Sequence, residues 1–159
     1  MKLIERAARD ELRMMHQNGV RVQVSGRIHE LPASLQQALL EGVETTARNT
    51  GITFTLAVNY GGRAEIVDAV RSLLHDGVPE DEIDEGAISA RLYNPAQPEP
   101  DLIIRTAGEM RTSNFLLWQA AYAELYVTDK PWPEFGRKDL ESALEAYAKR
   151  TRKFGAVVE

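Results

Sequence analysis

The feature that most constrains the fold of this chain is the alternation of short apolar stretches with longer amphipathic ones. Four stretches have the length and composition of strands: residues 20–24, 53–58, 102–104 and 125–127. Strands that alternate with helices build βαβ units, whose strands run parallel. We therefore predict an α/β fold, with an open, mostly parallel sheet and helices on both faces. A length of 159 residues suits one domain with a sizeable core, so residues 1–159 are predicted to form a single domain.

Apolar residues at helical spacing separate these strands. They predict helices over residues 4–15, 35–47, 63–75 and 140–147. The acidic run of residues 80–85 predicts the start of a short helix, because negative charge suits the positive end of a helix dipole. Residues 114–123 are apolar on nearly every side, which predicts a buried helix with Trp118 and Tyr122 in the core.

The composition excludes several classes of function. A formal net charge of −5 gives no electrostatic reason for general binding to nucleic acid, so no nucleic-acid partner is predicted. The sequence contains no cysteine, which excludes disulfides and thiolate metal sites. The first 15 residues carry charges throughout and match neither a signal peptide nor a membrane span. The prediction that follows is a cytoplasmic location.

The ends of the strands are where a ligand site is expected. In open α/β sheets, ligands bind outside the carboxyl ends of the strands. Polar residues follow two of the predicted strands, as Asn59-Tyr60-Gly61-Gly62-Arg63 and as Arg105-Thr106-Ala107-Gly108-Glu109. A tight turn from strand to helix explains the glycine pair of the first segment. The second segment begins a longer stretch that combines more of the residue types used to bind anions.

The stretch from Arg105 to Glu124 contains the residue types of a diphosphate and metal site. Arg105 and Arg111 flank a short loop, and two guanidinium groups that converge form a fork for phosphate oxygens. Thr112-Ser113-Asn114 is predicted to begin a helix, whose backbone N–H groups and dipole suit an anion, and the Ser113 hydroxyl adds a donor. Glu124 is predicted to end that helix, and a carboxylate near bound phosphates is the usual protein ligand of Mg²⁺.

Each of these residues has a simpler interpretation when it is taken alone. A single arginine after a strand is more often a surface or salt-bridge residue. Ser113 is explained as a helix cap, and Glu124 as an ion-pair partner of Arg105 or Arg111. Only their combination around one strand end favours a binding site over these alternatives.

Longer runs of the sequence resemble a known family. The run DLIIRTAGEMRTSNFLLWQAAYAELYVTDKPWPEF, residues 101–135, resembles the C-terminal signature of the cis-prenyltransferases, the undecaprenyl diphosphate synthase family. The resemblance extends to NTGITFTLAVNYGGRAEIVDAV (residues 49–70), to VRVQVSGRIHELP (residues 20–32) and to RTRKFG (residues 150–155). It therefore covers nearly the whole chain.

The resemblance implies an enzyme that condenses isopentenyl diphosphate onto an allylic diphosphate, forming a cis double bond and releasing pyrophosphate. It implies that four residues bind the isopentenyl diphosphate: Arg105, Arg111, Thr112 and Ser113. It also implies Mg²⁺ as the cofactor, with Glu124 as a ligand. Arg150 and Arg152 resemble part of a C-terminal segment that reaches across a dimer towards the diphosphate site, whereas in most such basic runs they are solvated tail charges.

The chain departs from the family pattern in several places. Ala107 stands where the family often has Ser or Gly, and Met110 where some members carry a His that assists the metal. An Asp-Gly-Asn-Gly-Arg-Trp motif, whose Asp manages Mg²⁺ and whose loop holds the allylic diphosphate, does not occur, nor does a Phe-Ser-x-Glu-Asn-Trp motif. We therefore expect the C-terminal portion of a longer enzyme, without the N-terminal strands of the family fold. Such a chain carries the isopentenyl diphosphate and Mg²⁺ half of the site, without the catalytic Asp, and is expected to be inactive alone.

Two other functions remain open at this point. One is a non-catalytic partner subunit that completes a heteromeric prenyltransferase. The other is a generic phosphate-binding or nucleotide-binding module, although the sequence has neither GxGxxG nor a P-loop. Missing strands would leave an uncovered sheet edge, which predicts a homodimer or a completing partner chain. The lipid product predicts a peripheral contact with a membrane.

Overall fold

The computed structural model of the chain describes residues 2–150, with side chains described from residue 10 onward. It divides into two compact units, residues 1–94 (unit 1) and residues 95–159 (unit 2). The single domain expected from the sequence stays a prediction. Within the described range, no helix combines the length and the apolar character needed to cross a membrane.

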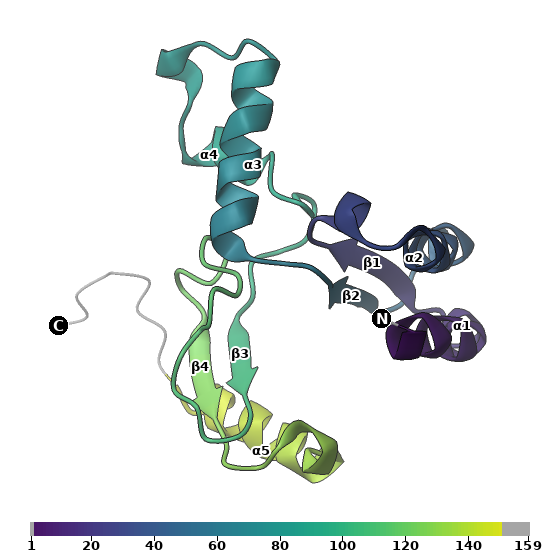
Figure 1. Ribbon diagram of the computed structural model, residues 1–159. Coiled ribbons are helices and arrows are strands. Elements are labelled where there is room, and N and C mark those ends of the chain that lie inside the picture. The colour runs from purple at the N-terminus through teal and green to yellow at the C-terminus, as the bar shows by residue number, and fades with distance from the viewer. Residues whose placement is uncertain (1, 151–159) are drawn as a thin grey trace, which may run out of the picture. The chain divides into compact units, whose positions relative to one another are not determined.

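Unit 1 consists of two parallel strands with helices before, between and after them (Figure 1). Its elements are α1 (Lys2–Gln17), β1 (Arg21–Ser25), α2 (Ala33–Thr46), β2 (Thr53–Ala57), α3 (Gly62–His75) and α4 (Glu85–Ser89), with short 3-10 helices at Ile28–Glu30 and Glu80–Glu82. Arg21 lies opposite Thr53 and Ser25 lies opposite Ala57. The predicted strands and helices of this part of the sequence are confirmed within a few residues.

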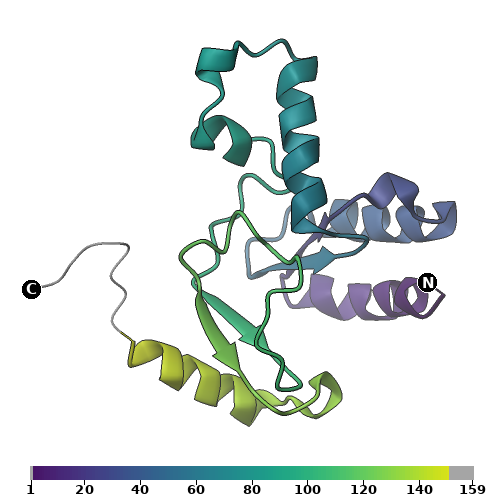
Figure 2. The ribbon, with the colours of Figure 1, turned by 60° about the vertical axis from the view of Figure 1, so that its left-hand side comes forward.

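The core of unit 1 forms where one face of α2 meets the strands. Leu35 and Leu39 lie four residues apart on that face, and they are 1% and 2% exposed. They cluster with Leu31, and four partly buried residues pack against the cluster: Val24, Ile28, Leu56 and Val58. Figure 2 shows α1 running beside α2. The helical spacing seen in the sequence is therefore the spacing that builds this core.

A buried hydroxyl connects α2 to β1. Thr46 is fully buried; its Oγ1 accepts a hydrogen bond from the Val22 backbone N–H at 2.9 Å and donates one to the Gly42 carbonyl at 2.8 Å. Valine has nearly the same shape as threonine but has no hydroxyl. The Thr46→Val substitution therefore leaves a backbone N–H without a partner inside the protein.

We expect Thr46→Val to lower the free energy of unfolding by about 1–3 kcal/mol, the cost of an unsatisfied buried donor. Urea denaturation followed by circular dichroism measures this change. Thr45→Val is the matched control, because Thr45 is the exposed neighbour on the same helix. Equal unfolding midpoints for the two variants would contradict the role assigned to the Thr46 hydroxyl.

Unit 2 contains two further parallel strands and one α-helix in its described part. Its elements are β3 (Leu102–Arg105), β4 (Glu124–Val127), a 3-10 helix at Trp132–Glu134 and α5 (Arg137–Ala148), which packs against β4 (Figure 2). Leu102 lies opposite Glu124, and Arg105 lies opposite Val127. The start of α5 is capped by the Asp139 carboxylate, which accepts a hydrogen bond from the Gly136 N–H at 3.0 Å.

The buried helix predicted for residues 114–123 is wrong. These residues form turns, with isolated helical hydrogen bonds such as that from the Ala120 N–H to the Leu116 carbonyl. Ser113, Asn114 and Leu116 have φ values of +48°, +63° and +48°, and left-handed residues interrupt a right-handed helix. Tyr122 is 59% exposed, so its placement in the core is also wrong, whereas Trp118 is half-buried.

The α/β class with parallel strands is confirmed. In the range 2–150, the four strands are distributed over two sheets of two strands each, where the sequence predicted one open sheet. Each sheet joins strands that are consecutive in the chain, with a connection between them that is long enough for a parallel crossover.

Candidate functional site

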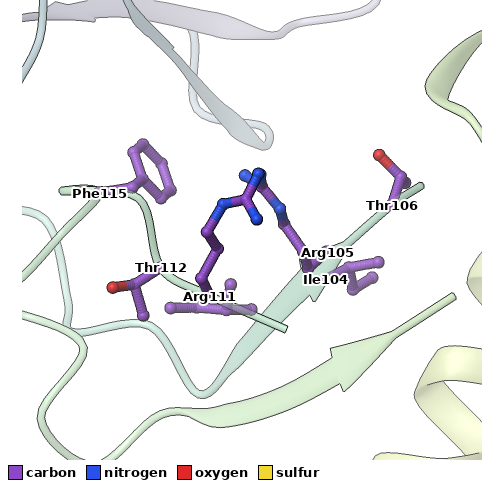
Figure 3. Close-up of a pocket in the computed structure, with 7 residues that line it drawn as sticks. Ile104, Arg105, Thr106, Arg111, Thr112 and Phe115 are labelled. Carbon is purple, nitrogen blue, oxygen red and sulfur yellow. The ribbon is translucent and has the colours of Figure 1, made fainter. Parts of the chain in front are cut away.

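A small pocket lies at the carboxyl end of β3, where the sequence places a ligand site. Its volume is about 210 Å³, below the roughly 300–1,000 Å³ of sites for drug-sized ligands. It is lined by Ile103, Ile104, Arg105, Thr106, Arg111, Thr112 and Phe115. Figure 3 shows the Arg105 and Arg111 side chains extending in the same direction, so that their guanidinium groups lie side by side. The convergence of these arginines, predicted from the sequence, is confirmed.

A carboxylate that the sequence reasoning did not use lies between the two arginines. Glu109 Oε2 accepts a hydrogen bond from Arg105 and Glu109 Oε1 accepts one from Arg111, so that one carboxylate bridges both guanidinium groups. The position of Glu109 between Arg105 and Arg111 in the sequence was the signal for it. We call this set the Arg105–Glu109–Arg111 triad.

The electrostatics of the triad favour an ionised Glu109. The hydrogen bond from Arg105 holds the pKa of Glu109 below its ordinary value, and the charge of Arg111 acts in the same direction. The triad therefore has a net charge of +1 near neutral pH, because two guanidinium groups face one carboxylate. Arg105 also has a buried Nε that makes no hydrogen bond within the described residues. The pocket therefore lies beside a net positive charge, which suits an anion.

The backbone around the pocket is held by the end of β4. The Ala107 N–H donates to the Lys130 carbonyl and the Gly108 N–H donates to the Thr128 carbonyl, each at 2.9 Å. Ala107 and Gly108 have φ values of +63° and +68°, which turn the chain back after β3. A Cβ added at Gly108 would lie 2.9 Å from Asp129 Oδ1, so a glycine fits this turn best. These contacts fix the loop that brings Arg111 back to Arg105.

The other residues predicted to bind the diphosphate differ in their placement. Thr112 lines the pocket, whereas Ser113, the next residue, is exposed and is not among its lining residues. No helix starts at Thr112-Ser113-Asn114, so the prediction that a helix N-terminus supplies backbone N–H groups to the anion is wrong. The left-handed backbone at Ser113 is the physical reason.

Glu124 and Arg150 lie together, at the other end of the sheet. Glu124 begins β4 opposite Leu102, whereas Arg105 ends β3 opposite Val127, so parallel pairing separates Glu124 from the pocket by the length of the strands. Arg150 forms an ion pair with the Glu124 carboxylate and donates to the Leu125 carbonyl at 3.1 Å. The alternative pairing of Glu124 with Arg105 or Arg111 is not the one observed. Arg152 lies outside the described residues.

The carboxylates of the described residues do not form a cluster that would hold Mg²⁺ by protein ligands alone. Residues 10–150 contain no group of three or more His, Asp or Glu side chains placed to hold a metal ion. The carboxylate of Glu124 is bound by a guanidinium group, which competes with a cation for its oxygens. The assignment of Glu124 as a metal ligand therefore stays a prediction from the family resemblance.

The second predicted strand end, residues 59–63, is occupied by a structural network. The Arg27 guanidinium makes two hydrogen bonds to the Asp68 carboxylate, each 2.9 Å long, and the Tyr93 hydroxyl donates to Asp68 at 2.7 Å. The hydrogen bond from Arg27 lowers the pKa of Asp68, and burial raises the pKa of Tyr93 to about 12. Asn59 donates to the Arg27 carbonyl at 3.0 Å. Internal partners thus engage Asn59 and the neighbouring side chains of Arg27, Asp68 and Tyr93.

Comparison with families of known proteins identifies relatives over nearly the whole chain. Residues 1–155 match the family described as "Putative undecaprenyl diphosphate synthase". The isoprenyl transferase of Fusobacterium nucleatum is 48% identical over 157 residues, which are 99% of this chain and 67% of that protein. The isoprenyl transferase of Clostridium perfringens is 43% identical over 99% of this chain and 64% of its own length. That of Heliobacterium mobile is 46% identical, and the matched region is 58% of its length.

Solved structures give the same result for the fold. Lavandulyl diphosphate synthase from Lavandula x intermedia, in complex with dimethylallyl diphosphate, has a TM-score of 0.92 and 37% identity over 98% of this chain and 69% of its own. A probable undecaprenyl diphosphate synthase from Campylobacter jejuni has a TM-score of 0.88 and 27% identity over 97% of this chain and 72% of its own. The chain spans about three fifths to two thirds of the length of the three isoprenyl transferases. On the family match, the sequence identity and the fold together, this chain belongs to the undecaprenyl diphosphate synthase family of cis-prenyltransferases.

Proposed function

We propose that the pocket at the end of β3 binds the diphosphate group of isopentenyl diphosphate in a cis-prenyl transfer reaction. The observation that carries this proposal is the convergence of Arg105 and Arg111 on one small pocket. Paired guanidinium groups match the geometry and charge of phosphate oxygens. The apolar lining from Ile103, Ile104 and Phe115 suits the short hydrocarbon part of the same molecule.

The reaction places definite demands on this pocket. The carbon–oxygen bond of an allylic diphosphate breaks and its electron pair leaves with pyrophosphate. A carbon–carbon bond forms between the allylic carbon and the terminal alkene carbon of isopentenyl diphosphate, which then loses a proton to give a new double bond. The diphosphate of isopentenyl diphosphate takes no part in bond breaking. The role of the two arginines is therefore to hold and orient the substrate, which accounts for much of the rate of such reactions.

The allylic substrate and the metal ion require groups other than the two arginines. We propose that the allylic diphosphate is bound outside the Arg105–Glu109–Arg111 triad, by a partner chain that completes the site. The family resemblance favours Mg²⁺ as the cofactor. The described residues contain no cluster of three or more carboxylate or histidine side chains, so the substrate phosphates would supply part of its coordination. A cytoplasmic enzyme with a peripheral membrane contact through its lipid product is consistent with these assignments.

Isothermal titration with isopentenyl diphosphate, and separately with ATP, tests the proposed ligand. We expect saturable binding of isopentenyl diphosphate and at least tenfold weaker binding of ATP, because the pocket of about 210 Å³ has no space for a nucleoside. Equal affinities would favour a generic nucleotide-binding module instead.

A second measurement concerns activity. Elongation requires both diphosphates to be held in line, and the 159 residues contain no Asp-Gly-Asn-Gly-Arg-Trp motif. We expect the purified chain to give no radiolabelled prenyl product from isopentenyl diphosphate and an allylic diphosphate. Activity that appears only when a full-length relative is added would favour the partner-subunit function. Product formed by the chain alone would overturn the proposal that another chain completes the site.

A further inference from the structure

Glu109 does not line the pocket, but its carboxylate bridges the two arginines that do. Like charges repel, so two guanidinium groups that lie side by side need an anion between them. Glu109 supplies that anion from the same loop, with one oxygen for each arginine. A diphosphate and Glu109 therefore require the same donors.

Glu109 satisfies the two arginines only in part. Each guanidinium offers five N–H donors in a planar arrangement, and a single carboxylate has two oxygens. The contacts to Glu109 come from one terminal nitrogen of each arginine, so the other terminal nitrogen of each guanidinium group makes no contact with Glu109. A diphosphate carries more oxygens and more negative charge than a carboxylate. It can therefore use donors that Glu109 leaves idle.

The exposure of the triad makes the Glu109 contacts replaceable. The side chains of Arg105, Glu109 and Arg111 are 32%, 38% and 63% exposed. Solvent screening limits an exposed ion pair to a factor of roughly five or less in an equilibrium constant. Such contacts position the arginines but do not prevent an anion of higher charge from taking them over.

The proposed prenyl transfer reaction requires the two arginines to exchange a bound diphosphate for another anion. The pyrophosphate that leaves comes from the allylic substrate, so the diphosphate of isopentenyl diphosphate stays on the lengthened product. The two arginines must therefore release a diphosphate after every condensation. A carboxylate that returns to them as the diphosphate leaves lowers the free-energy cost of that release.

We propose that Glu109 is a displaceable counter-ion: its carboxylate competes with the substrate diphosphate for Arg105 and Arg111, weakens diphosphate binding and promotes release. Glu109 is thus a positioning residue that acts through the two arginines. This inference rests on the proposed function of the pocket.

The test is the affinity for inorganic pyrophosphate, measured by isothermal titration at low salt with the whole chain. E109Q keeps the shape of the side chain and removes its charge. Removal of two exposed ion pairs is expected to tighten pyrophosphate binding by roughly 2- to 30-fold. The gain should shrink at high ionic strength, since salt screens exposed charges. E109A should also bind pyrophosphate more tightly than the wild-type chain, because it too removes the competing charge.

Glu141→Gln is the matched control. Glu141 also pairs with an arginine four residues away, Arg137, in the same unit, so E141Q makes the same change in net charge at another place. Its affinity for pyrophosphate is expected to stay within twofold of the wild-type value. A gain in E141Q equal to that in E109Q would assign the effect to net charge and overturn the proposal.

The remaining outcomes separate this inference from the proposed function. If the wild-type chain binds isopentenyl diphosphate and E109Q binds pyrophosphate equally or more weakly, Glu109 only holds the arginines in place; the counter-ion proposal then fails and the proposed function stands. If neither the wild-type chain nor E109Q binds either diphosphate, the proposed function fails as well. If E109Q and E109A bind pyrophosphate more tightly than the wild-type chain and E141Q binds it with unchanged affinity, the result supports both the counter-ion proposal and the proposed function.

Discussion

Replacement of Arg111 by alanine is expected to abolish binding of isopentenyl diphosphate. The substitution removes one of the two guanidinium groups of the pocket, and it leaves Glu109 paired with Arg105 alone. A bound diphosphate covers the Arg111 guanidinium group, and loss of one partner of such a buried, hydrogen-bonded charge pair weakens binding by about 30-fold or more. Because Arg111 is 63% exposed, its removal should leave the folded structure intact. Isothermal titration gives the affinity, and circular dichroism verifies the fold.

Two further variants make this result specific. Arg137→Ala removes an arginine that is 90% exposed and belongs to the same unit, and it should change the affinity by less than twofold, within the range of surface charge effects. Arg111→Lys keeps the charge but loses the planar fork, so it should bind with intermediate affinity. If Arg111→Ala bound isopentenyl diphosphate within threefold of the wild-type chain, Arg111 would not belong to the site.

Replacement of Gly26 by alanine is expected to have the largest effect on stability. Gly26 follows β1 and has a φ of +123°, a conformation that is essentially restricted to glycine. A Cβ at this position would collide with the Val58 carbonyl oxygen, and it would lie 3.0 Å from the Asn59 carbonyl oxygen. Backbone strain and displacement of this packed loop together amount to roughly 2–6 kcal/mol. Urea denaturation should show a loss of this size, or no folded unit 1 at all.

Gly77→Ala is the control for the backbone component. Gly77 has a φ of +69°, but a Cβ at this position meets no atom within 4 Å. Its alanine variant should lose only about 1–2 kcal/mol, the cost of the left-handed conformation for a residue with a side chain. If the two variants had equal unfolding midpoints, the close approach of Gly26 to Val58 would contribute nothing to the effect.

Sequence patterns alone identified most of the secondary structure and part of the site. The four strands and the helices outside residues 114–123 follow from local periodicity, because each is built from neighbours in the chain. Arg105 and Arg111 were identified together for the same reason: a short loop after a strand end separates them, so the chain itself brings them close. Family membership followed from long runs of matching sequence.

The helix predicted for residues 114–123 shows where local patterns fail. Leucine, alanine and glutamine in that segment favour a helix. The segment nevertheless begins with left-handed residues at Ser113 and Asn114, after a loop whose Ala107 and Gly108 are bonded to the end of β4. Contacts with distant residues constrain where this segment starts, and helix propensity is too weak a preference to override such contacts.

The sequence by itself determined the fold class, the strand ends and the pair of arginines, since these depend on spacing over a few residues. Only the tertiary structure decided which charged side chains form ion pairs with each other. Parallel register placed Glu124 at the far end of the sheet with Arg150. Folding joined Asp68 to Arg27 and to Tyr93, which are 41 and 25 residues away from it along the chain. The turn after β3 placed Glu109 between Arg105 and Arg111. Whether two charges pair depends on their distance in space. Strand register and turn geometry determine that distance, whereas spacing along the sequence does not.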